Sequence, residues 1–455
     1  MTTETEQKHI KQAIPALLGV FIVVTLLQQA FSIVSPVLAA DFDISISVVS
    51  LQVTMCLVVL GVCSVIFGAL SDFISIRKLY SIGFCIFGIG SIIGYFCQFS
   101  FYSVVVGRLL QTMGQASFGS LYLVLVSRYM PNREKVKYFA LFTGAFQLSQ
   151  VIGVFSGGFV TTYIHWSALF VIPLIIFAGM PIVIKKLPTN TIVQGRKIDI
   201  CGIGLISMTI LLVIFYLDFK QWMLLVLAVA CLISFIIYIN KNEKAFITAD
   251  YFKNKPYIWA VIIEFLLFSV QFVFPFIYSF IINGVFGETL DMVSYVLLPS
   301  YCIAALFAVF VVAGITKALN NFWATLVGAS FIIIGLFLTG IFMPFGLWAM
   351  SMTAILFSVG YAIIYSPMVD TIVETLPPKN VGTGIGLNDM VITISGSLGI
   401  TIVSGLMTNL NTVEGNTTNA IFQGFQLIFM GLATVIVLAI VLLFLKRKII
   451  YQNRK

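Results

Sequence analysis

Residues 48–98 read VVSLQVTMCLVVLGVCSVIFGALSDFISIRKLYSIGFCIFGIGSIIGYFCQ, two apolar stretches that are joined by a short charged turn at residues 71–78. Each stretch has about 20 residues and no charge, which is the length that an α-helix needs to cross the hydrocarbon core of a bilayer. The turn supplies one acid, Asp72, and two bases, Arg77 and Lys78. This pattern predicts two membrane-crossing helices with a charged loop between them.

The same pattern continues along the whole chain. Of its 455 residues, 60% are hydrophobic and 9% are charged, whereas about a quarter of the residues in soluble domains are charged. The sequence therefore predicts an all-α integral membrane protein. We expect fourteen transmembrane helices, near residues 14–38, 48–70, 79–98, 102–127, 138–161, 167–184, 200–217, 221–239, 257–282, 293–315, 322–342, 347–368, 383–408 and 421–445.

Lysine and arginine fall almost entirely on alternate loops. If the N-terminus is cytoplasmic, all 25 of these residues except Lys220 and Arg108 lie on the cytoplasmic side, as the positive-inside rule requires. We therefore expect both termini in the cytoplasm. The net charge of +8 needs no nucleic-acid partner, because this topology and contact with anionic lipid headgroups account for it.

Two polar cytoplasmic connectors divide the chain. They lie near residues 185–199 and 240–256 and bracket the seventh and eighth expected helices. We expect an N-terminal six-helix bundle at residues 1–184 and a linker with two additional transmembrane helices at residues 185–256. A C-terminal six-helix bundle and cytoplasmic tail would follow at residues 257–455. Two bundles of this kind are the plan of many secondary transporters.

The turn that begins at Gly68 could act as a conformational latch. Asp72 can accept hydrogen bonds from the amides at the start of a neighbouring helix, while Arg77 and Lys78 pair across the interface between bundles. Breaking these contacts would accompany rocking of the bundles. The alternative is a charge cluster at a helix end that only sets the topology.

Three charges lie clearly inside expected spans: Arg108, Glu264 and Asp389. A charge at mid-bilayer costs at least about 2.5 kcal/mol, so it is retained mainly where it faces a bundle interior or water. Glu264 and Asp389 lie at similar depth, and an apolar environment favours the neutral carboxyl. We expect these three residues to take part in proton coupling; the alternative is a permanently hydrogen-bonded structural carboxyl.

Polar side chains that share helix faces with these charges predict a cavity. Residues three, four or seven apart lie on one face of a helix, and such sets recur in several spans. Amide, hydroxyl and aromatic groups would suit a bulky amphipathic ligand, although each amide could instead form an interhelical hydrogen bond. The expected cavity residues are Gln28, Ser32, Gln111, Gln115, Gln147, Gln150, Gln271, Tyr361 and Tyr365.

The spacing Gly68-x-Leu70-x-Asp72-x4-Arg77-Lys78 resembles the loop 2–3 signature of the major facilitator superfamily. Arg108-x-x-Gln111-x-x-Gly114 is similar to that family's proton-coupling arginine motif, with Thr112 in place of a usual glycine. Helix 5 carries Gly153, Gly157 and Gly158, which resemble the antiporter motif, but Ser149 and Val154 replace its glycine and proline. The whole chain resembles the fourteen-helix drug:proton antiporter branch, which includes Gram-positive tetracycline and multidrug exporters.

This resemblance implies a multi-pass protein of the bacterial plasma membrane that exports lipophilic drugs, tetracycline-like or multidrug, in exchange for protons by alternating access. It implies a role in antibiotic resistance. An alternative cargo is a lipid, a fatty acid or another amphiphilic metabolite, exported with weak or no proton coupling. Val154 favours that alternative, as do Gln28 and Gln29, which stand where several exporters of this branch have an acid.

Other classes of function have little support in the sequence. An integral-membrane enzyme would need a cluster of catalytic groups, but the two histidines, His9 and His165, lie outside the spans. The seven cysteines lack the spacing of a metal site, and no nucleotide-binding loop occurs. We therefore expect no enzyme, no catalytic residue, no metal and no cofactor. The expected partners of this monomer are a small amphipathic substrate, protons and membrane lipids.

Overall fold

The computed structural model of the chain describes residues 4–71, 73–188, 199–242, 253–310, 312–376, 381–411 and 418–451. Those residues form helices, turns and short connections, without a β-strand. Among those residues thirteen helical segments are long and apolar enough to cross a membrane, against the fourteen expected. Every expected span consists mainly of helical residues, although some extend over more than one helix. The N-terminal helices are α1 (Glu4–Asp41), α2 (Ile46–Leu70), α3 (Ile76–Phe96), α4 (Phe101–Tyr129), α5 (Asn132–Tyr163), α6 (Ala168–Val171), the 3-10 turn η1 (Ile172–Ile175) and α7 (Ile176–Lys186).

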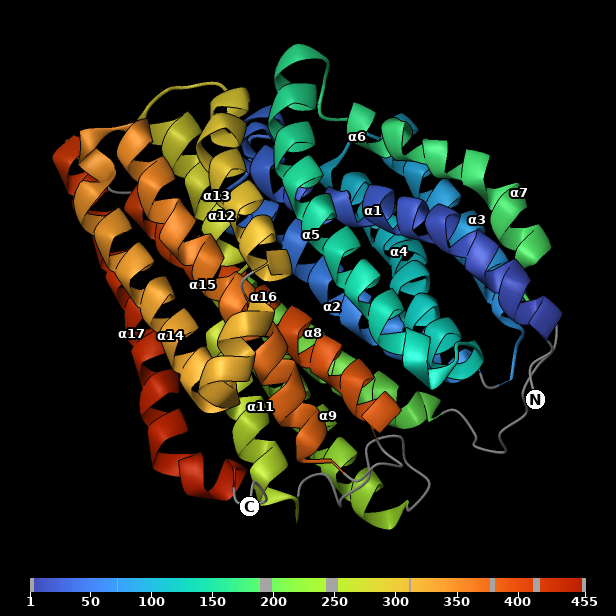
Figure 1. Ribbon diagram of the computed structural model, residues 1–455. Coiled ribbons are helices and arrows are strands. Elements are labelled where there is room, and N and C mark those ends of the chain that lie inside the picture. Colours follow the sequence, from blue (N-terminus) through green and yellow to red (C-terminus); the bar gives the residue numbers. More distant parts are fainter. Residues whose placement is uncertain are drawn as a thin grey trace.

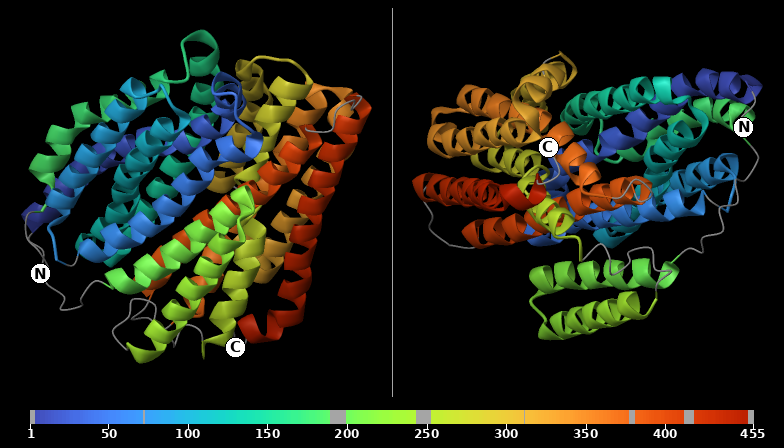
Figure 2. Two further views of the ribbon diagram at one scale, coloured as in Figure 1. Left: turned by 180° about the vertical axis from the view of Figure 1, so that it is seen from behind. Right: turned by 60° about the horizontal axis from the view of Figure 1, so that its bottom comes forward.

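The next two helices form a hairpin, α8 (Ile200–Phe219) and α9 (Trp222–Lys241). Figure 2 shows this hairpin on the outside of the molecule. Its helix α8 packs against α2 and α16, and most side chains of α9 remain exposed, as expected for a surface in contact with lipid. The apolar part of α8, Gly204–Leu217, is shorter than the other spans.

The C-terminal helices complete the fold. They run from α11 to α17. The series is α11 (Lys255–Phe268), α12 (Val273–Phe280), the π-helical turn η2 (Ile281–Val285), α13 (Leu290–Phe310), α14 (Val312–Phe342), η3 (Met343–Phe345), α15 (Leu347–Glu374), α16 (Val381–Asn411) and α17 (Thr418–Ile450).

The helices gather in two groups that meet in the middle of the molecule. Figure 1 shows α1 to α7 on one side and α11 to α17 on the other, and the groups meet mainly where α2 packs on α16 and α5 on α13. Both marked ends of the chain lie on the lower side of Figure 1. We call this side the terminal side and the other the distal side.

Two expected spans are interrupted, near Pro173 and at residues 269–272, and α14 has a third break at Asn320, which lies between the expected spans 293–315 and 322–342. Pro173 lies in η1 between α6 and α7, where a missing N–H and a fixed φ disturb the helix. A turn at residues 269–272 separates α11 from α12. Asn320 has φ 57° and ψ 168° within α14, and its side-chain oxygen accepts a hydrogen bond from the Trp323 amide. Asn320 therefore caps the long part of that helix.

Candidate functional site

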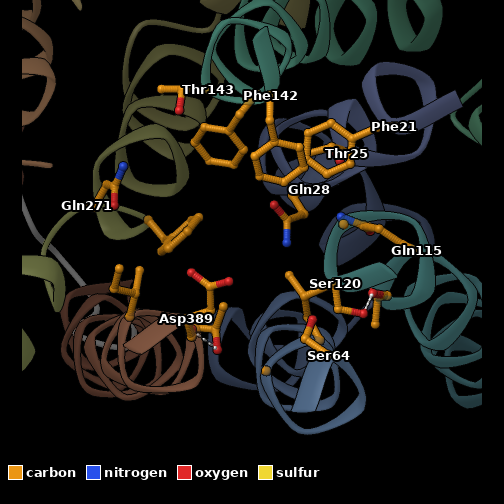
Figure 3. Close-up of a pocket in the computed structure, with 18 of the residues that line it drawn as sticks. Phe21, Thr25, Gln28, Ser64, Gln115, Ser120, Phe142, Thr143, Gln271 and Asp389 are labelled. Carbon is orange, nitrogen blue, oxygen red and sulfur yellow. Dashed lines mark hydrogen bonds between the residues drawn. The ribbon is translucent and has the colours of Figure 1, made fainter. Parts of the chain in front are cut away.

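A cavity lies between the two groups of helices, in the part of the molecule nearer the terminal side. It holds about 870 Å³ of space between protein atoms, part of which is open to solvent. Figure 3 shows Asp389 and Gln28 pointing into it from different helices. Its walls are lined by Phe21, Thr25, Gln28, Leu60, Gly61, Ser64, Gln115, Ala116, Gly119, Ser120, Phe142, Thr143, Phe146, Gln271, Phe272, Tyr365, Asp389, Ile392 and Thr393. We call this space the first cavity.

The two membrane-embedded acids lie near each other at one wall of the first cavity. Asp389 on α16 lines the cavity, whereas Glu264 on α11 is fully buried and close enough to Asp389 to interact with it electrostatically. Neither carboxyl oxygen of Glu264 makes a hydrogen bond of normal geometry, although the Asn388 amide lies near. The Tyr365 hydroxyl is also near enough to interact electrostatically with both acids.

A second cavity adjoins the first between α5, α13, α15 and the turn at residues 269–272. The two share the wall formed by Thr143, Phe146, Gln271 and Tyr365. Among the described residues that line the second cavity, none is charged. Its lining is Thr143, Phe146, Gln147, Gln150, Gln271, Tyr301, Ala304, Ala308, Phe357, Ser358, Tyr361, Ala362, Tyr365 and Ser366.

A glutamine pair links three helices beside the second cavity. The Gln29 amide of α1 donates to the Gln150 oxygen of α5 at 2.6 Å and lies 3.2 Å from the Tyr301 hydroxyl of α13. The Gln150 amide nitrogen is buried without a hydrogen-bond partner. These contacts join the two groups of helices through neutral groups.

Arg108 lies apart from both acids, inside the N-terminal group. It is fully buried, with its guanidinium 4.0 Å from the centre of the Phe31 ring and 3.3 Å from the Gln111 oxygen. Gln111 in turn donates to Ser91 at 2.8 Å. Within the described part of the chain no carboxylate pairs with Arg108. The structure thus places Glu264 and Asp389 together and Arg108 elsewhere.

The distal side is closed by direct contacts between the two groups. The Ser47 hydroxyl of α2 lies 3.1 Å from that of Thr408 on α16, and the Ser404 hydroxyl donates to that of Ser50 at 3.0 Å. Between α5 and α13, the Tyr163 hydroxyl donates to the Asp291 carboxylate at 3.0 Å. The first cavity is therefore separated from the distal side by packed helices.

The loop expected to act as a latch is described only in part, because Asp72 lies outside the described residues. Arg77 donates to the Leu187 carbonyl at 2.6 Å and to the Lys185 carbonyl at 3.2 Å, at the C-terminal end of α7. The Gly68 carbonyl accepts a hydrogen bond from Ser71. Arg77 thus binds within its own group of helices in this conformation, and a pairing of Arg77 or Lys78 across the bundles stays a prediction.

The three helix 5 glycines each occupy a crowded position. A Cβ atom at Gly153 would lie 2.5 Å from the Leu26 carbonyl oxygen of α1, and one at Gly157 would lie 2.8 Å from the Ala30 Cα. A Cβ at Gly158 would collide with the Leu290 carbonyl and the Ser294 hydroxyl of α13. Gly153 and Gly157 thus let α5 approach α1 closely within the N-terminal group, whereas Gly158 lies where the two groups meet.

Seven of the nine expected cavity residues line one of the two cavities. Ser32 and Gln111 do not: the Ser32 backbone oxygen faces Ser279 at 3.5 Å, and Gln111 is committed to Arg108. The residues that line a cavity are Gln28, Gln115, Gln147, Gln150, Gln271, Tyr361 and Tyr365.

Sequence reasoning missed other cavity residues. Phe21, Phe142 and Phe146 form apolar walls of the first cavity, and Tyr301 lines the second. Their helical spacing alone could not separate a cavity wall from the apolar contacts that fill every span. Among the described residues, no group of three or more histidine, cysteine, aspartate or glutamate side chains could hold a metal ion.

An apolar helical molecule with a cavity of mixed aromatic and polar lining between two groups of helices, closed on one side by direct contacts, is typical of a polytopic membrane transporter. The chain belongs to the Major Facilitator Superfamily, whose family model matches residues 17–400. Members of this family are transporters, and the expectation from the three motifs is thereby confirmed at the level of the family. The chain is a multi-pass protein of the plasma membrane.

Curated relatives are similar over most of the chain. The riboflavin transporter RibZ of Clostridioides difficile (strain 630) is 26% identical over 382 residues, which are 81% of each protein. The quinolone resistance protein NorB of Staphylococcus aureus (strain MRSA252) is 24% identical over 429 residues, 90% of this chain and 92% of NorB.

Solved structures share the fold. A POT family transporter in complex with 5-aminolevulinic acid matches with a TM-score of 0.70 at 15% identity, over 96% of both chains. A D-xylose-proton symporter matches with a TM-score of 0.65 at 13% identity, also over 96% of both chains. At these identities the likeness concerns the fold alone.

Proposed function

We propose that this protein exports lipophilic, drug-like molecules in exchange for protons by alternating access. The observation that carries the proposal is the pair of acids at the first cavity. Asp389 lines the cavity, and Glu264 lies fully buried next to it. A carboxyl on the cavity wall can exchange protons with water, and a second one behind it can hold a proton away from water.

The surroundings of Glu264 favour its neutral form. An ionised carboxylate enclosed without a hydrogen bond or a counter-ion costs far more free energy than a neutral one, and both oxygens of Glu264 lack a hydrogen bond. We infer that Glu264 is protonated in this conformation. Ionisation of Asp389 would depend on whether substrate or water occupies the first cavity, and this dependence would couple substrate to proton movement.

The proposed cargo is a lipophilic drug, and tetracyclines are one class to test. The first cavity combines three phenylalanine rings, Phe21, Phe142 and Phe146, with glutamine amides, as pockets for drug-sized ligands do. NorB is named for quinolone resistance, which supports a drug-like substrate and a role in antibiotic resistance. We propose no cofactor, and we propose that the protein works as a monomer among membrane lipids.

The membrane topology is part of the same proposal. We propose fourteen crossings with both termini in the cytoplasm, arranged as bundles at residues 1–184 and 257–455 with an inserted pair at 185–256. The peripheral α8–α9 hairpin supports the inserted pair, and the position of both chain ends on one side supports the shared location of the termini. The first cavity would then be the inward-facing site.

Transport by purified protein in proteoliposomes tests this function. With an imposed proton gradient, we expect uphill movement of a tetracycline or a quinolone. Asp389→Asn and Glu264→Gln should each reduce uphill movement at least about tenfold, because a carboxamide cannot carry the proton. At least one of the two variants should keep substrate-for-substrate exchange. Glu288→Gln, outside both cavities, is the control and should transport normally.

Absence of uphill movement by the unmodified protein under every proton gradient would contradict proton-coupled export. Full uphill transport by both acid variants would contradict the assigned role of Glu264 and Asp389.

A second candidate is an exporter of an amphiphilic metabolite, a lipid or a fatty acid with weak or no proton coupling. RibZ is named as a riboflavin transporter, which supports a metabolite as cargo. Efflux of riboflavin or a fatty acid that persists in the presence of an uncoupler would favour this candidate, whereas efflux that stops would favour proton coupling.

A further inference from the structure

The peripheral α8–α9 hairpin lies over one of the two seams at which the groups of helices meet. Its helix α8 packs against α2 of the N-terminal group and also against α16 of the C-terminal group. Figure 2 shows the hairpin on the outside of these helices. At the other seam, between α5 and α13, the side chains of Phe155 and Tyr295 remain exposed. The helix α8 therefore touches both halves of the molecule at a single seam.

A small apolar cluster, which we call the seam cluster, holds α8 in this place. At its centre Ile214 of α8 and Val58 of α2 are fully buried, and Leu51 of α2 is 3% exposed. The partly buried side chains packed against these three are Met55, Val62, Ile210, Leu211, Phe215 and Leu398. Of the whole cluster, Leu398 alone belongs to α16. Most of its apolar contacts thus join α8 to α2, and Leu398 adds the opposite half of the molecule.

The seam cluster lies at the depth of the polar contacts that close the distal side. Leu51 follows Ser50, whose hydroxyl accepts the hydrogen bond from Ser404 at 3.0 Å. Ser397, which precedes the α16 member of the cluster, donates to the Thr54 carbonyl at 2.9 Å. A separation of α2 from α16 at this depth therefore breaks these hydrogen bonds and also divides the seam cluster.

We propose that α8 is a brace that stabilises the closed distal side. It moves with the N-terminal group, and its apolar contact with α16 is made in this conformation and lost when the distal side opens. The proposal takes alternating access from the proposed function and goes beyond it, because it gives the inserted hairpin a role in the cycle.

The brace acts through van der Waals packing. In a bilayer, an apolar contact between helices gains little from removal of water, since lipid tails are as apolar as leucine, and close packing supplies the attraction instead. Ile214 cannot remain packed on both α2 and α16 once these helices part. A contact that exists in only one of two states shifts the equilibrium towards that state. The seam cluster therefore favours the conformation with the distal side closed.

Modification of a buried cysteine measures how often the seam opens. Ser50→Cys, in protein whose seven native cysteines are replaced by serine or alanine, places a thiol at a fully buried position of the seam. The full-length protein in nanodiscs, without substrate or a proton gradient, is treated with a dilute, membrane-impermeant thiol reagent. When opening and closing outpace modification, the labelling rate is proportional to the fraction of molecules in which the seam is open.

The test variant is Ile214→Ala, and Leu212→Ala is the matched control. Leu212 lies on the same helix and is 6% exposed, but it is not part of the seam cluster. We expect Ile214→Ala to raise the labelling rate of Ser50→Cys at least about fivefold and Leu212→Ala to change it less than about twofold, because only the first variant removes packing across the closed seam. Leu398→Ala, on the opposite side of the contact, should also raise the rate. A thermal unfolding midpoint measured for each variant identifies those that are correctly folded.

An unchanged labelling rate in correctly folded Ile214→Ala, or an equal increase in Leu212→Ala, would overturn the brace and leave proton-coupled export intact. If labelling behaves as expected but no gradient drives uphill transport by the unmodified protein, the brace stands and proton-coupled export fails. Should Ile214→Ala not fold, Leu398→Ala carries the same expectation, and an unchanged rate there overturns the proposal.

Discussion

Arg108 is the largest of the fully buried side chains, and no carboxylate among the described residues pairs with it. It is held by the Phe31 ring and the Gln111 amide, and its Nε atom has no hydrogen-bond partner. A buried ionic group often lowers stability relative to an apolar residue of similar volume. At the scale of single residues, Arg108 is therefore explained better by function than by folding.

Replacing Arg108 by methionine separates these two explanations. We expect Arg108→Met to be neutral or stabilising by as much as about 4 kcal/mol, because the desolvation cost of the charge is removed. Transport should nevertheless fall at least tenfold. The measurements are the thermal unfolding midpoint in detergent and uphill transport in proteoliposomes. A lower midpoint together with normal transport would show that Arg108 is a structural residue.

The cavity residues show how far sequence reasoning reaches at this scale. Helical spacing placed Gln111 and Gln115 on one face of the same helix, yet only Gln115 lines the first cavity. Gln111 lies one turn further towards the distal side, where Arg108 and Ser91 occupy its amide. The helical repeat predicts the face of a helix on which a residue lies. Whether a cavity opens beside that face at the depth of the residue depends on the tilt of the neighbouring helices. The sequence contains no direct record of that tilt.

At the scale of helices, Gly158 controls how closely α5 approaches α13. A Cβ there would collide with Leu290 and Ser294, and the Ser294 hydroxyl donates to the Val154 carbonyl at 2.7 Å. Gly144, on the same helix, has no atom near an added Cβ. The two glycines thus form a matched pair for mutation.

Gly158→Ala should open the distal contact between α5 and α13, whereas Gly144→Ala should not. Both glycine-to-alanine changes stabilise the helical conformation by up to about 1 kcal/mol. Any difference in transport between the two variants is therefore due to the collision of the added Cβ at position 158. We expect Gly158→Ala to lower the initial rate of transport in proteoliposomes at least about fivefold and Gly144→Ala to leave that rate unchanged. The same behaviour in both variants would contradict the assigned contact.

The starts of α1 and α5 are joined by an ion pair that should not act as a pH switch. Lys11 lies 2.8 Å from Glu134, and this hydrogen bond lowers the pKa of the Glu134 carboxyl. A lowered carboxyl pKa means that the contribution to stability is complete above the ordinary carboxyl value and is lost only as the pH falls through the lowered value. Near neutral pH the contribution of this ion pair to stability therefore does not change with pH.

Glu134→Gln should leave the pH profile of transport between about pH 6 and pH 8 unchanged, because the Glu134 carboxyl does not titrate there. Asp389→Asn should change the profile in the same range if Asp389 carries the proton. Parallel initial-rate measurements in proteoliposomes compare the two. A shifted profile for Glu134→Gln would show that the α1–α5 contact takes part in coupling.

The helices themselves were predictable, and their interruptions were not. Apolar length identified each span, since about 20 uncharged residues have few alternatives to crossing the membrane. The change from α6 to α7 near Pro173 had a visible signal in the proline. The break at residues 269–272 and the π-helical turn that follows α12 had no visible signal in the sequence. The break at residues 269–272 contains neither glycine nor proline, so tertiary packing decides the local geometry there.

At the scale of the whole molecule, this structure would be one of the two states of the proposed alternating-access cycle. The first cavity lies towards the terminal side, because its lining residues on α2, α4, α5 and α16 lie mainly towards the ends of those helices on that side. Hydroxyl pairs close the distal side between α2 and α16. Alternating access requires these distal contacts to break when the cavity opens to the other side. The hydroxyl contacts are weak individually, which suits a contact that must break in every cycle.

A reversible cross-link between Ser47 and Thr408 tests alternating access most directly. Their hydroxyl oxygens lie 3.1 Å apart, so we expect Ser47→Cys and Thr408→Cys together to place two thiols near enough to form a disulfide, with an S–S bond of about 2.0 Å, on oxidation. The seven native cysteines are first replaced by serine or alanine, and each single cysteine variant is the control. Uphill transport in proteoliposomes is then measured in the oxidised and the reduced double variant. We expect oxidation to abolish transport and a reductant to restore it, while full transport by the cross-linked protein would contradict alternating access.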